Sequence, residues 1–287
     1  MRCGSGSSLT YFPGSPVLQL PSYSVCAVRL SSVFRFARPS YVWRGQRGFC
    51  AVCARATYFL VTCEPSLLRD DAFCVWCGSI SRQRHLALAV VEAFSGLGVR
   101  TFREIAERAD VAIWHTSARG PIAAVLRQAH QRAIRAAASS YTALAPVFLT
   151  DFFDGVPSGM IQGGVICEDL QATTFDDDRF DLVITEDVLG HVADYRRALQ
   201  ELGRVLKPGG CHVFTVPYYP DEQTQQLFAP SRNGDRPMAA RTRFGADLAH
   251  EMEGFGFRVV VRQTSPPEIR RHATHHCTTF IARKGAI

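Results

Sequence analysis

The chain has 287 residues, of which 47% are hydrophobic and 20% are charged, as in an ordinary globular protein. No run of about eighteen apolar residues is present, so the sequence predicts no membrane span, and we expect a cytoplasmic protein. The net charge is +6, and all of this excess lies in residues 1–100, which hold 11 Arg, no Lys and four acidic residues. Such a basic part is typical of proteins that meet nucleic acids or other polyanions.

The first segment, residues 1–48, is rich in Ser, Pro, Gly and Arg and shows no sustained hydrophobic period. A segment of this composition does not bury enough apolar surface to form a core of its own. We therefore expect residues 1–48 to form a disordered tail.

Two pairs of cysteines follow, Cys50 with Cys53 and Cys74 with Cys77, in the spacing C-x2-C-x20-C-x2-C. Two residues between the members of a pair let both thiolates face one ion, and two pairs complete a tetrahedral zinc site without an open position. The sequence therefore predicts a zinc-ribbon-like module over residues 49–83, held by a structural Zn²⁺. The alternatives are thiols without a metal and a redox-active pair.

A second group of metal-binding residue types occurs in HATHHC, residues 272–277. It offers His272, His275, His276 and Cys277. Histidines clustered just before a terminal strand are mostly surface residues, so we predict no metal site there.

The remainder, residues 84–287, alternates between helix and strand patterns and predicts one α/β domain. Apolar and β-branched runs predict seven strands, at 110–117, 146–153, 165–170, 180–187, 211–219, 257–264 and 278–284. Amphipathic runs predict helices at 84–94, 120–140, 191–206 and 244–256, and Lys207-Pro208-Gly209-Gly210 is a strong helix stop. This alternation predicts a doubly wound, mainly parallel, seven-stranded, Rossmann-like sheet. Ligands of such sheets lie at the carboxyl ends of the strands.

With these elements, the chain resembles the class I S-adenosylmethionine-dependent methyltransferases of the methyltransferase type 11 group. The resemblance covers roughly residues 105–285 and rests mainly on CEDLQATTFDDDRFDLVITEDVLGHV, residues 167–192, and on RVLKPGG, residues 204–210. It implies S-adenosylmethionine as the cofactor and methyl transfer as the reaction. The cysteine module is also similar to N-terminal zinc modules of some such methyltransferases.

The resemblance implies roles for acidic residues that follow successive strands. Asp151 would hold the ribose hydroxyls, and Glu168, Asp169 and Leu170 would contact the adenine. The alternative is that these acids cap turns and loops. The segment after the fourth strand would border the methionine end and the substrate, with Thr185, Glu186, Asp187 and His191.

The loop after the first strand departs from the family's Gly-rich pattern. It reads His115-Thr116-Ser117-Ala118-Arg119-Gly120, with His115 where an acid is common and a single Gly. We expect Ser117, Ala118 and Gly120 to approach the cofactor. Where the acceptor needs a base, His191 and Glu186 are the expected catalytic residues, with His115 as a further candidate; His191 packed at a helix start is the alternative.

Three functions follow from these patterns. The first is methyl transfer to a small molecule, a lipid or a sugar precursor. The second is methyl transfer to RNA or protein, with the zinc module as a reader, because the first hundred residues are basic. The third is a non-catalytic scaffold, because the loop at residues 115–120 is poor in Gly.

Overall fold

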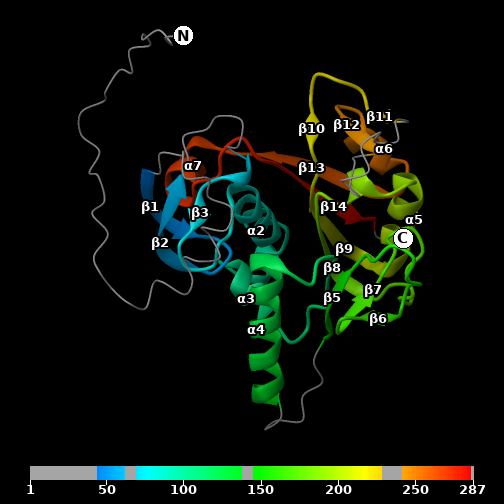
Figure 1. The fold of residues 1–287 in the computed structure, drawn as a ribbon, viewed down its shortest axis with the longest axis horizontal. Helices are drawn as coiled ribbons and strands as arrows, with labels where there is room; N and C mark the ends of the chain where they lie inside the picture. The colour runs from blue at the N-terminus through cyan, green and yellow to red at the C-terminus, as the bar shows by residue number, and fades with distance from the viewer. Residues whose placement is uncertain (1–43, 62–68, 138–144, 228–240, 286–287) are drawn as a thin grey trace, which may run out of the picture.

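The computed structural model describes residues 44–61, 69–137, 145–227 and 241–285 (Figure 1). Residues 1–43 of the predicted tail lie outside the described part. The centre is an eight-stranded sheet in the order β13-β14-β9-β8-β4-β5-β7-β6. Its strands are β4 (Ile113–His115), β5 (Val147–Asp151), β6 (Ile161–Gln162), β7 (Val165–Cys167), β8 (Phe180–Glu186), β9 (Leu206–Thr215), β13 (Phe257–Gln263) and β14 (Thr278–Lys284).

The strands β7, β5, β4, β8 and β9 run parallel to one another, while β14 pairs antiparallel with both β9 and β13. The predicted doubly wound, mainly parallel sheet is therefore confirmed. The predicted number of seven strands is one short, because the two-residue strand β6 adds an antiparallel edge beside β7.

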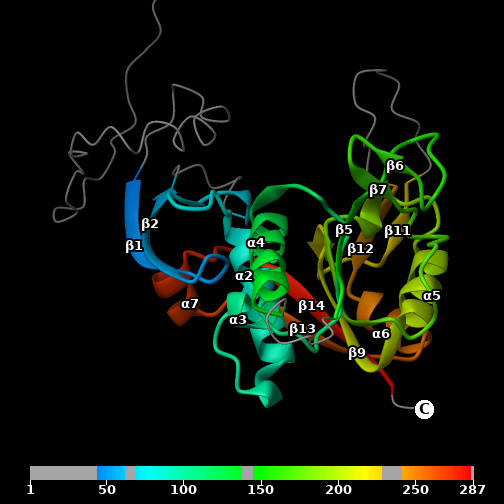
Figure 2. The same cartoon turned by 90° about the horizontal axis from the view of Figure 1, so that it is seen from below.

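Helices cover both faces of this sheet (Figures 1 and 2). One face carries α2 (Ser81–Ala93), α3 (Phe102–Ala106) and α4 (Gly120–Ala137), and the other carries α5 (Tyr195–Val205) and α6 (Leu248–Glu253). Successive residues of a strand enter opposite cores: Leu182 and Ile184 join one hydrophobic cluster, and Val183 joins the other. Burial on both faces explains why the central strands read as nearly continuous apolar runs.

The predicted helix stop at Lys207-Pro208-Gly209-Gly210 lies directly after α5, where the chain already enters β9. Gly209 has φ +78°, which favours glycine. A Cβ at Gly210 would lie 2.9 Å from the carbonyl oxygens of Lys207 and Phe180. Both glycines are therefore required for the irregular first residues of β9, where its register with β8 shifts.

The cysteines lie in a small antiparallel sheet of β1 (Arg44–Cys50), β2 (Arg55–Val61) and β3 (Phe73–Cys74). This sheet lies on the far side of α2 and α4 from the central sheet (Figure 1). Strand β1 begins at Arg44, so it includes five residues of the predicted tail. Strand β1 pairs with β2, from Arg44 opposite Val61 to Cys50 opposite Arg55. This pairing holds residues 44–48 in a strand, although their own sequence has no strand pattern.

The cysteine-bearing strands share a core with the α/β part. Cys50, Val52 and Phe59 belong to the same hydrophobic cluster as Ile113 and Leu182. The expected boundary between residues 83 and 84 falls inside α2, so one helix serves both parts.

The buried side chain of Arg84 fastens this junction. Its guanidinium donates hydrogen bonds to the carbonyl oxygens of Ser79, His272 and Ala273, and it lies 4.2 Å from the centre of the Phe59 ring. His272 ends α7 (Pro266–His272), which packs beside β1. A buried cation with these partners ties the N-terminal strands to the C-terminal part of the chain.

Three further short elements complete the described part: β10 (Tyr218–Tyr219), β11 (Gln225–Gln226) and β12 (Thr242–Gly245), which form a sheet in the order β10-β12-β11. The chain between β11 and β12 includes residues 228–240, which lie outside the described part. None of the helices that the structure describes is long and apolar enough to cross a membrane.

Candidate functional site

The parallel strands β4, β5, β7 and β8 end at one edge of the sheet and bring the predicted acidic residues there. Asp151 ends β5, and Glu168 follows β7. The backbone N–H of Glu168 donates to the carbonyl oxygen of Asp151 at 3.0 Å. His115 ends β4 and Glu186 ends β8. Residues separated by up to 71 positions in the sequence therefore meet at this edge.

His115 and Glu186 form a direct pair. Nε2 of His115 lies 3.1 Å from Oε1 of Glu186, and the histidine ring is fully buried. Nδ1 of His115 is buried and has no hydrogen-bond partner among the described residues. The loop after β4 thus has a carboxylate beside it, although that carboxylate comes from the neighbouring strand.

Glu186 also accepts from the start of α2. Gln83 donates from Nε2 to Oε2 at 2.9 Å, and Arg82 lies 3.4 Å from the same oxygen. Burial alone would raise the pKa of Glu186, but the hydrogen bond and charge of His115 and the charge of Arg82 together lower it. Glu186 is therefore an ionised carboxylate held among hydrogen-bond donors.

Asp187 is bound by two arginines. Arg69 donates two hydrogen bonds to its carboxylate, and Nε of Arg82 lies 3.2 Å from Oδ2. Burial would raise the pKa of Asp187, but the bond from Arg69 and the charges of Arg82 and Arg69 lower it. Its φ of +55° is left-handed, a conformation that is uncommon outside glycine.

The sequence analysis missed Arg69, Arg82 and Gln83. They belong to the segment 69–83, which also contains Cys74 and Cys77. Nothing in the local pattern distinguishes these polar residues from an ordinary solvated helix start. Their role depends on contacts with residues more than 100 positions away.

The other acidic residues expected near the cofactor differ in how many hydrogen bonds their carboxylates already accept from the protein. Asp151 is partly exposed, and its Oδ1 accepts from the backbone N–H of Phe152 at 3.1 Å. Glu168 is 5% exposed and binds the backbone N–H and hydroxyl of Thr174. Asp169 accepts from Gln171. The carboxylates of Glu168 and Asp169 thus stabilise local turns, as the alternative interpretation expects.

Three further expected residues are buried or have a buried polar atom. Leu170 is buried in the core, and Thr185 is fully buried, with its hydroxyl 3.0 Å from Nε2 of His212. His191 ends the 3-10 turn η3 (Leu189–His191), and its Nδ1 is buried with no hydrogen-bond partner in the described part. No hydrogen bond between His191 and Glu186 is found among the described residues.

Hydrogen bonds within the loop after β4, and from α4 to it, hold this loop in place. The hydroxyl of Ser117 donates to the carbonyl oxygen of Arg119 at 3.2 Å, and the carbonyl oxygen of Ala118 accepts from Arg127 at 2.7 Å. Gly120 begins α4 with φ +88°, so glycine is required there. A Cβ at Gly120 would lie 3.9 Å from Nε2 of Gln83, which places this loop beside the segment 69–83.

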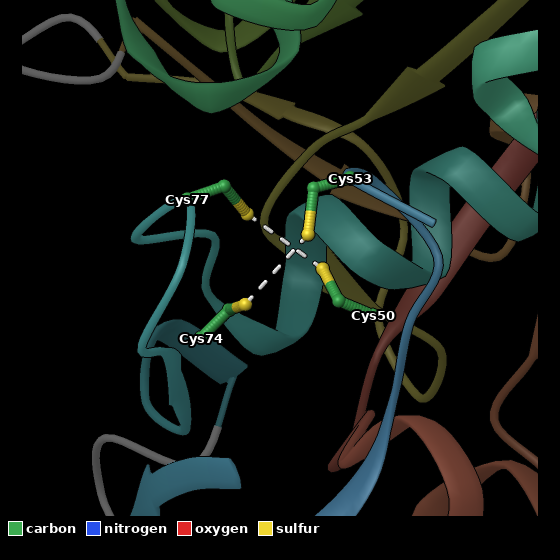
Figure 3. A group of neighbouring side chains, drawn as sticks. All are labelled: Cys50, Cys53, Cys74 and Cys77. Carbon is green, nitrogen blue, oxygen red and sulfur yellow. Dashed lines mark hydrogen bonds between the residues drawn. The ribbon is translucent and has the colours of Figure 1, made fainter. Parts of the chain in front are cut away.

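A second site is formed by the four predicted cysteines, whose sulfur atoms converge on one point (Figure 3). Their ligand atoms all lie within 4.8 Å of one another, with Sγ–Sγ distances of 3.6 Å for Cys50–Cys77 and 4.0 Å for Cys53–Cys74. Zinc–sulfur bonds of about 2.3 Å in a tetrahedron place sulfur atoms about 3.8 Å apart. The observed sulfur–sulfur distances of 3.6 and 4.0 Å lie close to this value and far above the bonded distance of about 2.05 Å in a disulfide. The four sulfurs therefore fit a zinc ion.

The two cysteine turns have the same backbone geometry. Ala54 and Gly78 each follow a C-x2-C pair with positive φ, at +54° and +74°. The N–H of Ala54 donates to the carbonyl oxygen of Cys50 at 2.9 Å, and that of Gly78 donates to Cys74 at 2.8 Å. This repetition is what two zinc knuckles facing one ion require.

The HATHHC sequence forms no such group. Among the described residues, the four cysteines alone make up a cluster with metal-ligand geometry. His272 bonds instead to the carbonyl oxygen of Phe49 through Nδ1 at 2.6 Å, and the thiol of Cys277 donates to the carbonyl oxygen of His275.

At the sheet edge, the residues present fit S-adenosylmethionine by donor chemistry. Asp151 offers a partly exposed carboxylate, which suits vicinal hydroxyls. Glu186 offers an ionised carboxylate, which suits an ammonium group and which in this structure pairs with His115, Gln83 and Arg82. The buried Nδ1 of His115 lacks a described partner, as a polar atom beside a ligand would before binding.

Comparison with known proteins supports this assignment over part of the chain. Residues 155–214 match the family described as "Methyltransferase domain". A segment of 50 residues is 44% identical to dimethylglycine N-methyltransferase of Parasynechococcus marenigrum (strain WH8102); it spans 17% of this chain and 18% of that protein.

Solved structures were also found. An S-adenosylmethionine-dependent methyltransferase of Mesorhizobium loti is 15% identical, covering 69% of this chain and 100% of its own, with a TM-score of 0.39. The YcgJ protein of Bacillus subtilis is 12% identical, covering 71% and 100%, also with a TM-score of 0.39. Similarity at this level says nothing of the activity of this chain. The match of residues 155–214 to the methyltransferase domain family confirms the resemblance inferred from the sequence.

Proposed function

We propose that the chain is an S-adenosylmethionine-dependent methyltransferase whose cofactor lies at the carboxyl ends of β4, β5 and β8. The observation that carries this proposal is the meeting of Asp151 and the His115–Glu186 pair at that edge, with Glu186 inside the segment 155–214 that matches the methyltransferase domain family. The cofactor supplies an electrophilic methyl group on a sulfonium. The protein has to position the acceptor in line with that methyl group and to exclude water.

Within this site, Asp151 accepts hydrogen bonds from the ribose hydroxyls, and the backbone around Leu170 borders the adenine. Glu186 receives the ammonium group of the methionine part, in place of an acid that the loop at residues 115–120 lacks. Its lowered pKa keeps it ionised at neutral pH, which favours this role over that of a general base. His191 stays a candidate base.

The chemical class of the methyl acceptor stays a prediction. A small molecule, a lipid or a sugar precursor is the first expectation from the sequence. Dimethylglycine N-methyltransferase acts on a small amine by its name, but the aligned segment spans only 18% of that protein. The cytoplasmic location likewise stays a prediction.

The four cysteines hold a structural Zn²⁺. Their sulfurs leave no position open for a substrate or water, so the metal would stabilise the fold and take no part in catalysis. Because Cys74 and Cys77 lie between Arg69 and Arg82, the metal would also fix the segment 69–83 against Glu186 and Asp187. We infer that zinc is required for tight cofactor binding.

The first prediction concerns Asp151. Asp151→Asn should weaken the affinity for S-adenosylhomocysteine about ten- to hundredfold, because a hydrogen bond to a charged acceptor contributes about 1.5–3 kcal/mol. Isothermal titration calorimetry on the zinc-loaded full chain measures this change. Asp154→Asn, the same substitution at an exposed residue three positions after β5 ends, should leave the affinity unchanged. Absence of binding by the unaltered, folded protein would refute the proposed function and favour the scaffold.

The second prediction separates the two roles of Glu186. Glu186→Gln should weaken S-adenosylhomocysteine about tenfold or more, since it removes the charge that holds the ammonium group. The affinity for 5′-methylthioadenosine, which lacks the ammonium group, should not change. Glu253→Gln on the exposed surface of α6 is the control, and melting curves verify folding. Equal weakening of both ligands would contradict the ammonium role.

The third prediction concerns the metal. Protein purified without chelators should contain about one zinc per chain by elemental analysis, as a closed four-thiolate site binds one ion. Cys77→Ser should lose that zinc, lower the melting temperature and weaken S-adenosylhomocysteine binding, while Cys167→Ser, in β7, should keep the metal. Retention of one zinc by Cys77→Ser would show that these four thiolates are not its ligands.

A further inference from the structure

A groove of about 250 Å³ lies between the cysteine-bearing strands and the helices α3 and α4. Arg55 and Trp76 line it from the cysteine side, and Arg103, Gln128 and Arg132 line it from the helices. The groove is smaller than most pockets for whole ligands, which measure about 300–1,000 Å³. It is therefore suited to one planar group with a charged neighbour.

Three arginines and no acidic residue stand among the described residues that line the groove. Glu107, which pairs with Arg103 at 3.0 Å and with Arg132 at 2.7 Å, offsets part of this positive charge. Cys53 and Cys77 also line the groove, and four thiolates on one Zn²⁺ would carry a net negative charge, so the positive charge is that of the guanidinium groups on the walls. The surrounding elements continue this pattern, because residues 44–61 and the whole of α4 contain no Asp or Glu. The guanidinium groups on its walls are suited to bind an anionic partner.

The aromatic side chain at this groove is unusually exposed and yet fixed. Trp76 is 45% exposed, whereas tryptophan is mostly buried in folded proteins. Its indole N–H donates to the carbonyl oxygen of Ala56 at 3.1 Å, and the guanidinium carbon of Arg55 lies 5.8 Å from the ring centre. A second Arg–aromatic pair, Arg47 with Tyr58, joins β1 to β2.

The position of the groove connects it to the proposed active site. Pro121, at the start of α4, lines the groove, and the preceding residue, Gly120, faces Gln83, which binds Glu186. A chain lying in the groove would thus lead from the cysteine-bearing strands toward the loop at residues 115–120.

We propose that this groove binds a single-stranded nucleic acid, with an unpaired base stacked on Trp76 and phosphates bound by Arg55, Arg103 and Arg132. A rigid exposed ring among arginines is what sequence-tolerant binding of single strands requires. An acidic peptide would use the charge but would gain little from the fixed ring. The binding does not depend on the cofactor; that the strand carries the methyl acceptor rests on the proposed function.

The test is fluorescence anisotropy with labelled single strands of about 15 nucleotides, the upper range of common binding sites, on the zinc-loaded full chain. Separate RNA and DNA probes show which of the two nucleic acids the groove binds more tightly. The logarithm of the affinity should fall with the logarithm of salt concentration with a slope of about −2, because each of three phosphate contacts contributes about 0.7.

Trp76→Ala should weaken binding about tenfold, and Trp76→Phe should retain most of it, since a phenyl ring still stacks. Arg55→Gln and Arg132→Gln should each reduce the magnitude of the slope by about 0.7, and Arg258→Gln, at an exposed position on β13, should not. Zinc content and melting temperature verify that the variants fold.

The proposal would be overturned by no binding of single strands, by binding that the groove variants leave unchanged, or by binding of a poly-glutamate peptide in preference to nucleic acid. Equal affinity for a duplex would exclude stacking on Trp76 and overturn it as well. Because S-adenosylhomocysteine is titrated separately, failure of the groove and failure of the proposed methyl transfer are distinguishable.

Discussion

The ion pairs of Arg69 and Arg82 with the acids that end β8 are the constraint on which the rest of the site depends. Arg69 binds Asp187, and Arg82 reaches both Asp187 and Glu186. These contacts lie at 15–25% side-chain exposure on the arginine side, where screening by solvent is weaker than at an open surface. They bring the segment 69–83 over the edge at which parallel strands present ligands.

The segment 69–83 connects the four-cysteine cluster to the acidic residues at the end of β8, which lie far apart in the sequence. Cys74 and Cys77 fix it to β1 and β2 through the four-sulfur cluster, and Gln83 fixes it to Glu186. Buried Arg84 then ties it to the end of α7. A metal site remote from the reacting atoms can in this way determine the geometry of the cofactor site.

Much of this architecture follows from local sequence. The apolar runs at residues 110–117, 146–153 and 180–187 predicted the parallel strands, and the C-x2-C spacing predicted the four-cysteine cluster. The order of β1 and the roles of Arg69 and Gln83 were not predictable, because they depend on partners far along the chain. For the same reason, the sequence did not show that Thr174 and Gln171 donate hydrogen bonds to Glu168 and Asp169, for which contact with the adenine stays a prediction.

The most direct test of the central claim, that the segment 69–83 forms part of the cofactor site, is hydrogen–deuterium exchange of the zinc-loaded full chain with and without S-adenosylhomocysteine. The account predicts slower exchange on binding in residues 69–83, together with residues 115–120 and the end of β8. Binding that slows exchange near Asp151 but leaves residues 69–83 unchanged would contradict it, and would separate the cysteine-bearing segment from the cofactor.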